Sequence, residues 1–109
     1  MAYDLNLEKR IETHLPKFGL IVKKKMFGGI GYLINGNMCF GIHKDALVVR
    51  TTAEIAQDLL KQDHIRVFDI TGRAMKGWIM VGTEFVNDDH SLLSMLETGI
   101  AFAIQMPKK

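Results

Sequence analysis

The chain has 109 residues and a formal net charge of +2; 48% of its residues are hydrophobic and 24% are charged. This length and composition suit one compact globular domain over 1–109 and exclude a disordered or fibrous chain. The single cysteine, Cys39, excludes an internal disulfide. No segment approaches the roughly 18 continuous apolar residues of a membrane-spanning helix, and the N-terminus has no signal-peptide pattern. We therefore expect a cytoplasmic protein with no membrane partner.

The N-terminal segment has the apolar spacing of a helix, with Leu7, Ile11, Leu15 and Phe18 three or four residues apart. Asp4 is a suitable N-cap. Because the residue before a proline avoids helical backbone angles, Pro16 predicts that the regular helix ends near His14 or Leu15.

From Ile21 onward the apolar pattern changes to that of strands. The dipeptide Asn35-Gly36 favours a tight hairpin, since both residues tolerate positive φ. The alternation predicts one shared face for Ile30, Tyr32 and Ile34, and for Met38, Phe40 and Ile42 after the turn. A second turn at Lys44-Asp45 leads into a third strand over 46–50.

Glycines are dense in this region, at Gly28, Gly29, Gly31 and Gly41. A phosphate-binding loop must open a helix, because the free N–H groups of the first helical turn hold the anion. Here "GGIG" opens a strand, so we interpret the glycines as structural, at bulges or at close approaches of another element.

The second half predicts a helix, one or two strands and a last helix. Thr51 with Glu54 forms a capping-box pattern, and Ile55 and Leu59 are expected to face inward. A strand over 77–82 follows "RVFDITGRAMK", which is expected to hold a short edge strand and a turn at Gly72. Asp88 or Asp89 caps the last helix, whose apolar stripe comprises Leu92, Leu96, Ala103, Leu93, Ile100 and Ile104. The predicted class is α+β, an antiparallel sheet with helices packed against it, in the order helix, three or four strands, helix, one or two strands, helix.

The residues show no catalytic or metal-binding signature. The four histidines have no zinc spacing with each other or with Cys39, and neither serine lies in a nucleophile motif. A cysteine inside a strand is usually a small buried hydrophobe, and His43 is expected on the hairpin face opposite Phe40, together with Cys39. We expect no enzyme activity, no metal and no cofactor.

Two clusters of side chains are candidates for contact with a partner. Lys23, Lys24 and Lys25 alternate between the faces of a strand, which is typical of a sheet edge; the alternative is a patch for nucleic acid or an acidic partner. The run "TGRAMKGW" contains residue types that anchor interfaces, although Trp78 could instead fill the core while the cations are solvated. Arg50 joins this surface if strands 46–50 and 77–82 are neighbours. The predicted interaction surface therefore comprises Arg73, Met75, Lys76 and Trp78, supported by Arg50, Lys23, Lys24 and Lys25.

Four motifs together resemble the N-terminal domain family of TfoX, also called Sxy, a regulator of bacterial natural competence. They are "KKMFGG" at 24–29, "INGNMC" at 34–39, "LVVR" at 47–50 and "TGRAMKGW" at 71–78. The resemblance implies a secretion-chaperone-like α+β arrangement, no catalytic residues and no cofactor. It also implies an accessory role in transcription of DNA-uptake genes, through protein contacts with the transcription machinery. Ala74 stands where relatives often have proline, and we expect a single-domain relative without the second domain that full-length regulators carry.

Three functional hypotheses follow. The leading one is a non-enzymatic interaction module of regulatory type with a protein partner. The second is direct nucleic-acid binding by the basic first half, in which residues 1–50 contain eight Lys and Arg against four Asp and Glu. The third is a small-ligand pocket, suggested by the glycines and the seven methionines. Self-association through a sheet edge is a further hypothesis.

Overall fold

The computed structural model describes residues 3–26, 28–68 and 76–107. The elements in chain order are α1 (Leu5–His14), the 3-10 helix η1 (Leu15–Phe18), β1 (Val22–Met26), β2 (Gly29–Ile34), β3 (Asn37–His43), β4 (Ala46–Arg50), α2 (Ala53–Leu59), β5 (Ile65–Val67), β6 (Trp78–Val81) and α3 (Asp89–Ala103). This is the predicted α+β order, with four strands before α2 and two after it. The expected turn at Gly72 lies outside the described residues.

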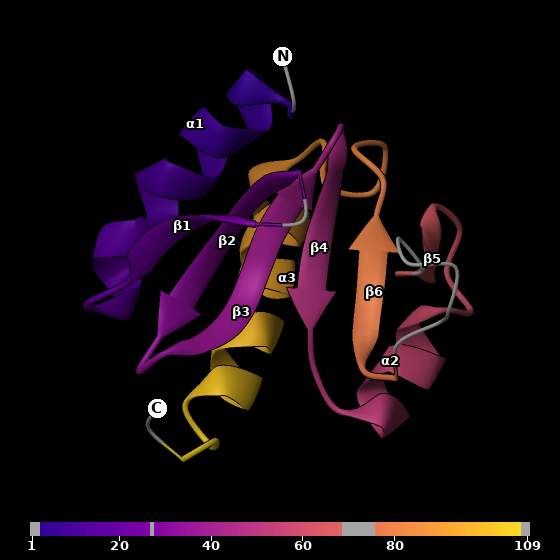
Figure 1. Cartoon of the computed structure of the whole chain (residues 1–109). Coiled ribbons are helices and arrows are strands. Elements are labelled where there is room, and N and C mark those ends of the chain that lie inside the picture. The colour runs from indigo at the N-terminus through magenta and orange to yellow at the C-terminus, as the bar shows by residue number, and fades with distance from the viewer. Residues whose placement is uncertain (1–2, 27, 69–75, 108–109) are drawn as a thin grey trace.

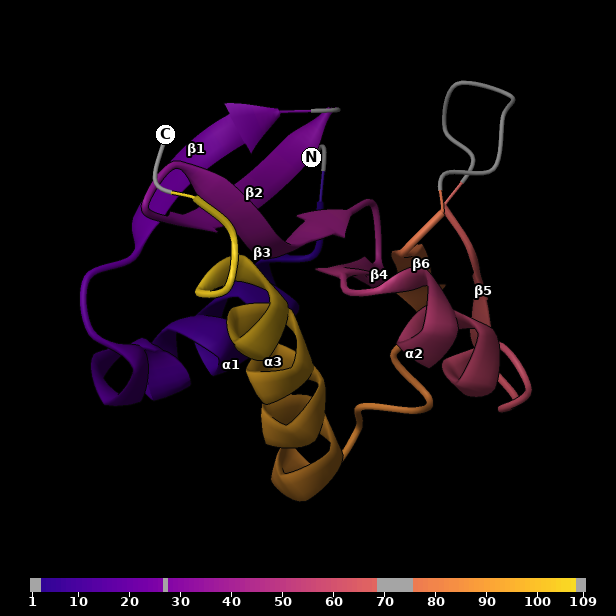
Figure 2. The same cartoon turned by 90° about the horizontal axis from the view of Figure 1, so that it is seen from below.

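The strands form one antiparallel sheet in the order β1-β2-β3-β4-β6-β5. In Figure 1 the sheet is seen with α3 crossing behind it and β1 at the left edge. Figure 2 shows α1 and α3 beneath the same part of the sheet, and α2 at the end that carries β5 and β6. Of the helices that the structure describes, none is both long and apolar enough to cross a membrane.

Two of the three helix caps are as predicted. The Asp4 carboxylate accepts from the N–H groups of Asn6 and Leu7, and α1 ends at His14, two residues before Pro16. The Asp88 carboxylate accepts from the Ser91 N–H, which lowers the pKa of Asp88 below its usual range. Both caps satisfy amide groups that the first turn of a helix leaves without partners.

The capping box predicted at Thr51 is wrong by one residue. The backbone N–H of Thr51 donates to the Gly77 carbonyl at 2.7 Å, which extends the pairing of β4 with β6 past the strand end. The helix therefore begins one residue later, with Thr52 as its N-cap. With the helix starting one residue later, Ile55 is exposed, contrary to the prediction, and Ala56 is buried instead.

The hairpin between β2 and β3 turns at Asn35 and Gly36, which have φ of 54° and 82° as the Asn-Gly signal predicts. A register shift follows, because Leu33 pairs with Met38 whereas Tyr32 pairs with Phe40. Cys39 is thus an extra residue, and the alternation of faces is interrupted.

The bulge corrects two predictions about side-chain faces. Met38 does not share a face with Phe40; it packs with the cluster on the other side of the sheet. Cys39 packs with Phe40 in the main core, not on the opposite face. The cysteine is fully buried, as expected for a small hydrophobe.

The sheet carries a hydrophobic cluster on each face. The main cluster lies between the sheet and the helices. It includes the fully buried Tyr32, Phe40, Leu47, Ile79, Leu92 and Leu96. The second cluster comprises Met38, Ala46, Val48, Phe68 and Met80, with Met26, Leu33 and Trp78 packed against it. Most of the apolar surface whose burial stabilises the domain therefore lies around the central strands.

Glycine permits close approach at two places in the core. A Cβ at Gly99 of α3 would overlap the Cys39 carbonyl oxygen, so the helix sits directly on β3. A Cβ at Gly29 would overlap the Ile42 carbonyl oxygen. The second contact confirms a structural role for Gly29 among the early glycines, whereas Gly99 was not singled out from the sequence.

Candidate functional site

The end of β4 and the start of β6 lie side by side near α2 (Figure 1). Three side chains come together there. Arg50 and Trp78 are register partners, which confirms that the two strands are neighbours. The Arg50 guanidinium carbon lies 5.2 Å from the centre of the Trp78 ring and 5.0 Å from that of Phe102, near the end of α3. A guanidinium at these distances is attracted by the electron-rich ring faces. We call Arg50, Trp78, Phe102 and the neighbouring Lys76 the Trp78 corner.

Trp78 lies between the two placements that the sequence left open, a side chain in the core and an exposed side chain. Its ring stacks on Phe68 with centroids 5.8 Å apart and an interplanar angle of 24°, so part of the side chain belongs to the second hydrophobic cluster. The residue is nevertheless only half-buried. Part of the tryptophan therefore stays accessible beside the exposed Lys76.

A slot of about 330 Å³ opens next to the corner, between α2 and the start of β6. Its lining residues are Ala53, Ala56, Gln57, Leu60, Val67, Lys76, Gly77 and Trp78. The α2 residues recur at helical spacing, and the two alanines leave the space that a larger side chain would fill. The slot is mainly apolar, with one cationic group, and can accept an apolar side chain next to a carboxylate.

A second cavity of about 370 Å³ lies on the other side of the α2 N-terminus and shares Phe102 with the corner. It is lined by Thr51, Thr52, Ile55, Ser94, Glu97, Thr98, Ala101, Phe102 and Gln105. The Thr51 hydroxyl is buried without a hydrogen-bond partner among the described residues. The corner therefore contributes Lys76 and Trp78 to the slot and Phe102 to the second cavity.

The lysine run occupies the opposite edge of the sheet. Lys23 Nζ contacts Glu12 Oε2 at 2.7 Å and Glu8 Oε2 at 3.0 Å, and these hydrogen bonds, to Glu12 first, raise the pKa of Lys23. The Tyr32 hydroxyl also donates to Glu12, at 3.1 Å. Lys23 therefore ties the edge strand to α1 and is not free for a partner.

The predicted interaction surface is therefore divided. Arg50, Lys76 and Trp78 lie together, whereas Lys23–Lys25 belong to β1. Two strands, β2 and β3, lie between β1 and β4, and three strands, β2, β3 and β4, lie between β1 and β6. Lys24 and Lys25 are exposed. Arg73 and Met75 lie outside the described residues.

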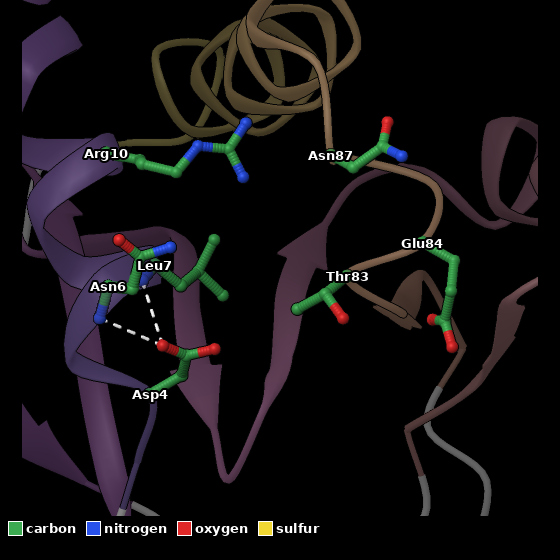
Figure 3. Close-up of a pocket in the computed structure, with 7 residues that line it drawn as sticks. All are labelled: Asp4, Asn6, Leu7, Arg10, Thr83, Glu84 and Asn87. Carbon is green, nitrogen blue, oxygen red and sulfur yellow. Dashed lines mark hydrogen bonds between the residues drawn. The ribbon is translucent and has the colours of Figure 1, made fainter.

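Figure 3 shows a third concavity, of about 550 Å³, between the start of α1 and the loop before α3. Two of its polar side chains, Asp4 and Arg10, already serve the fold. Asp4 caps α1, and the Arg10 guanidinium donates to the Val86 carbonyl at 2.6 Å and reaches Asp89 at 3.4 Å. The two buried side-chain atoms without partners in the described chain belong to Asn37 and Thr51, which do not line this concavity. It has the character of a polar surface groove.

Among the described residues, reactive groups are not gathered into a site. Within 3–26, 28–68 and 76–107, no group of three His, Cys, Asp or Glu side chains could hold a metal ion. Burial raises the pKa of the Cys39 thiol to about 12, and its Sγ donates to the Tyr32 carbonyl at 3.1 Å. The thiol is therefore protonated at neutral pH and a poor nucleophile.

These observations define a small α+β domain with an aromatic and cationic corner beside an apolar slot. Residues 13–103 of the chain match the family model for the TfoX N-terminal domain. The match covers most of the chain, which therefore belongs to the TfoX N-terminal domain family, as its sequence motifs predicted. No curated protein and no solved structure matches the chain.

Sequence reasoning missed some residues of the site. Phe102 approaches Arg50 through the packing of α3, and no local pattern indicates that contact. Phe68 supports Trp78 from the end of β5 in the same way. The spacing of Ala53, Ala56 and Leu60 was a readable signal, because small residues on one helical face leave room for a ligand or a partner.

Proposed function

We propose that this chain is a non-enzymatic regulatory module that binds a protein partner through the Trp78 corner and acts in the transcription of DNA-uptake genes. Membership of the TfoX N-terminal domain family supports the regulatory role. The partner expected from that role is a component of the transcription machinery.

The observation that carries the proposal is the position of the Arg50 guanidinium over the rings of both Trp78 and Phe102, next to the slot of about 330 Å³. Tryptophan and arginine are the residues that most often dominate binding energy, because they bury a large area and add directed hydrogen bonds. Both rings hold the Arg50 side chain in place, so little conformational entropy is lost when it meets a partner.

The geometry also sets the chemistry of the partner's contact residues. The slot is lined by Ala53, Ala56 and Leu60 on one side and by Trp78 on the other, which suits a leucine-sized or aromatic side chain. Lys76 beside it favours a carboxylate on the partner. A segment that alternates apolar and acidic residues meets both requirements.

The test is a quantitative pull-down from cells that express the chain at its native level, with RNA polymerase subunits measured by mass spectrometry. The bait variant Arg50→Gln with Lys76→Glu removes the guanidinium and reverses the exposed charge. We expect recovery of the polymerase to fall about tenfold or more, the size typical of losing central interface residues.

The matched control is Lys9→Glu, a charge reversal at an exposed residue of α1. It is expected to leave recovery unchanged. Equal recovery with the folded corner variant and the wild type contradicts the proposal, as does no enrichment of transcription proteins over empty beads. Circular dichroism and thermal unfolding establish that each bait is folded.

A further inference from the structure

The edge strand β1 presents an open side that the Trp78 corner does not use. Among the described residues, β1 pairs only with β2, so every second residue of Val22–Met26 directs its N–H and C=O away from the sheet. Residues 22–25 are exposed. The other edge, β5, has only three residues (Ile65–Val67) and offers a much shorter template.

We propose that β1 binds an extended acidic segment of another protein as an additional antiparallel strand of the sheet. In this mode the main-chain hydrogen bonds supply affinity and the neighbouring side chains supply specificity. An edge of five residues is long enough to pair with a typical strand.

Charge selects an acidic occupant. Lys24 pairs in register with Gly31 and Lys25 with Ile30, so the two side chains project from opposite faces of the strand. Unlike Lys23, neither has an ion-pair partner within the described part of the chain. A partner strand with two consecutive carboxylates would place one beside each lysine.

Exposed apolar residues at the start of β1 favour an apolar residue at the matching position of the partner strand. Val22 is 56% exposed, and Leu20 just before it is 88% exposed. In an antiparallel pairing, a partner residue three positions after the one opposite Lys25 lies opposite Val22. The expected recognition sequence is therefore Glu-Glu-Thr-Val or a close equivalent, with an apolar residue at its end.

A second copy of this chain is a poor occupant of the same edge. Antiparallel self-pairing centred on Lys24 would place Lys24 opposite its own copy and Lys23 opposite Lys25. Like charges directly opposite each other destabilise a strand pair. The edge therefore favours an acidic partner over a twin.

The test uses the full chain and a fluorescent peptide, Thr-Thr-Glu-Glu-Thr-Val-Thr-Thr, with a peptide that has Lys-Lys in place of Glu-Glu as the charge control. We expect the acidic peptide to bind with a Kd below about 1 mM, as judged by anisotropy, and the basic peptide not to bind. Hydrogen exchange of the bound chain is expected to slow in Val22–Met26 and to stay unchanged in Ile65–Val67.

Two double variants separate the β1 edge from general charge attraction. Lys24→Glu with Lys25→Glu is expected to weaken peptide binding about tenfold or more, and the neutral Lys24→Gln with Lys25→Gln less than that. Lys61→Glu with Arg66→Glu makes the same change in net charge at the other end of the sheet and is expected to have little effect. All the substituted residues are exposed, so the variants should fold.

Several outcomes overturn the proposal. These are no binding of the acidic peptide at 1 mM, equal weakening by both charge-reversal pairs, or binding without slower exchange in β1. Tight binding of a single-stranded oligonucleotide that is lost in Lys24→Glu with Lys25→Glu, without peptide binding, assigns the edge to nucleic acid instead. A wild-type dimer in sedimentation velocity that dissociates in the same variant assigns it to a second copy.

Discussion

Both ends of the sheet carry cationic side chains, but different interactions fix these side chains in place. At the β1 end Lys23 forms hydrogen-bonded ion pairs with Glu8 and Glu12. At the β6 end Arg50 lies over the rings of Trp78 and Phe102. Ion pairs between exposed groups weaken with salt, whereas the short-range attraction of a partly buried cation to a ring face is screened much less. Similar residue types therefore stabilise the fold in one place and, as we propose, bind a partner in the other.

The largest expected difference between the two ends comes from a pair of glycines with similar backbone angles. Gly77 has φ of 79°, and a Cβ there would overlap the Thr51 carbonyl oxygen. Gly28 has φ of 72° with nothing within 4 Å. We expect Gly77→Ala to lower the free energy of unfolding by about 2–4 kcal/mol and Gly28→Ala by only about 1 kcal/mol. Urea denaturation measures both, and equal losses would contradict the tight packing of the corner.

Alkaline pH should act on the β1 end. Burial, and then the nearby Glu12, raise the pKa of Tyr32 above its ordinary value of 10.0. The protonated hydroxyl is thus favoured in the folded state, and its contribution is complete below pH 10 and lost as pH rises beyond it. We expect the free energy of unfolding to fall by roughly 1 kcal/mol from this group by pH 10.5. Denaturation of Tyr32→Phe across pH 9–10.5 should show a shallower decline; an identical decline contradicts the assignment.

Salt should separate the two cations. We expect Arg50→Gln to cost roughly 0.5–1 kcal/mol of unfolding free energy at any salt concentration. The Lys23 side chain is 46% exposed, and solvent screening limits the loss in Lys23→Gln to about 0.5 kcal/mol. This smaller loss should vanish near 1 M NaCl, where the Debye length is about 3 Å. Equal salt dependence of the two variants would remove the distinction between the two ends.

The smallest effect is expected at Lys24. It is exposed and has no ion-pair partner in the described part of the chain, so Lys24→Ala should change the free energy of unfolding by less than about 0.5 kcal/mol. Thermal unfolding at matched salt checks this. A clear loss of stability would mean that Lys24 supports the fold, as Lys23 does.

Local signals predicted the elements well because they act over a few residues. The Asp4 cap, the proline stop after α1 and the Asn35-Gly36 turn depend only on near neighbours. The errors come from contacts between distant segments. Pairing with Gly77 keeps Thr51 in extended structure and shifts the α2 cap, and the bulge at Cys39 moves Met38 to the other face.

The candidate site was predictable only where strand order fixed it. Because β4 and β6 are neighbouring strands, Arg50 lies opposite Trp78, as expected. Phe102 reaches Arg50 because α3 packs against the sheet, and Lys23 pairs with Glu8 because α1 packs against it. No residue spacing in the sequence indicates either contact. The structure therefore brings part of the predicted surface together, while its lysine run belongs to a different edge.

The central claim is that the Trp78 corner meets a protein partner, and site-specific photo-crosslinking in living cells tests it most directly. A photoreactive amino acid replaces Lys76 in one strain and Lys9 of α1 in another. We predict crosslinks to a component of the transcription machinery from position 76 and none from position 9. Equal crosslinking from both positions, or no protein adduct at position 76 while the chain still regulates its genes, would contradict the account.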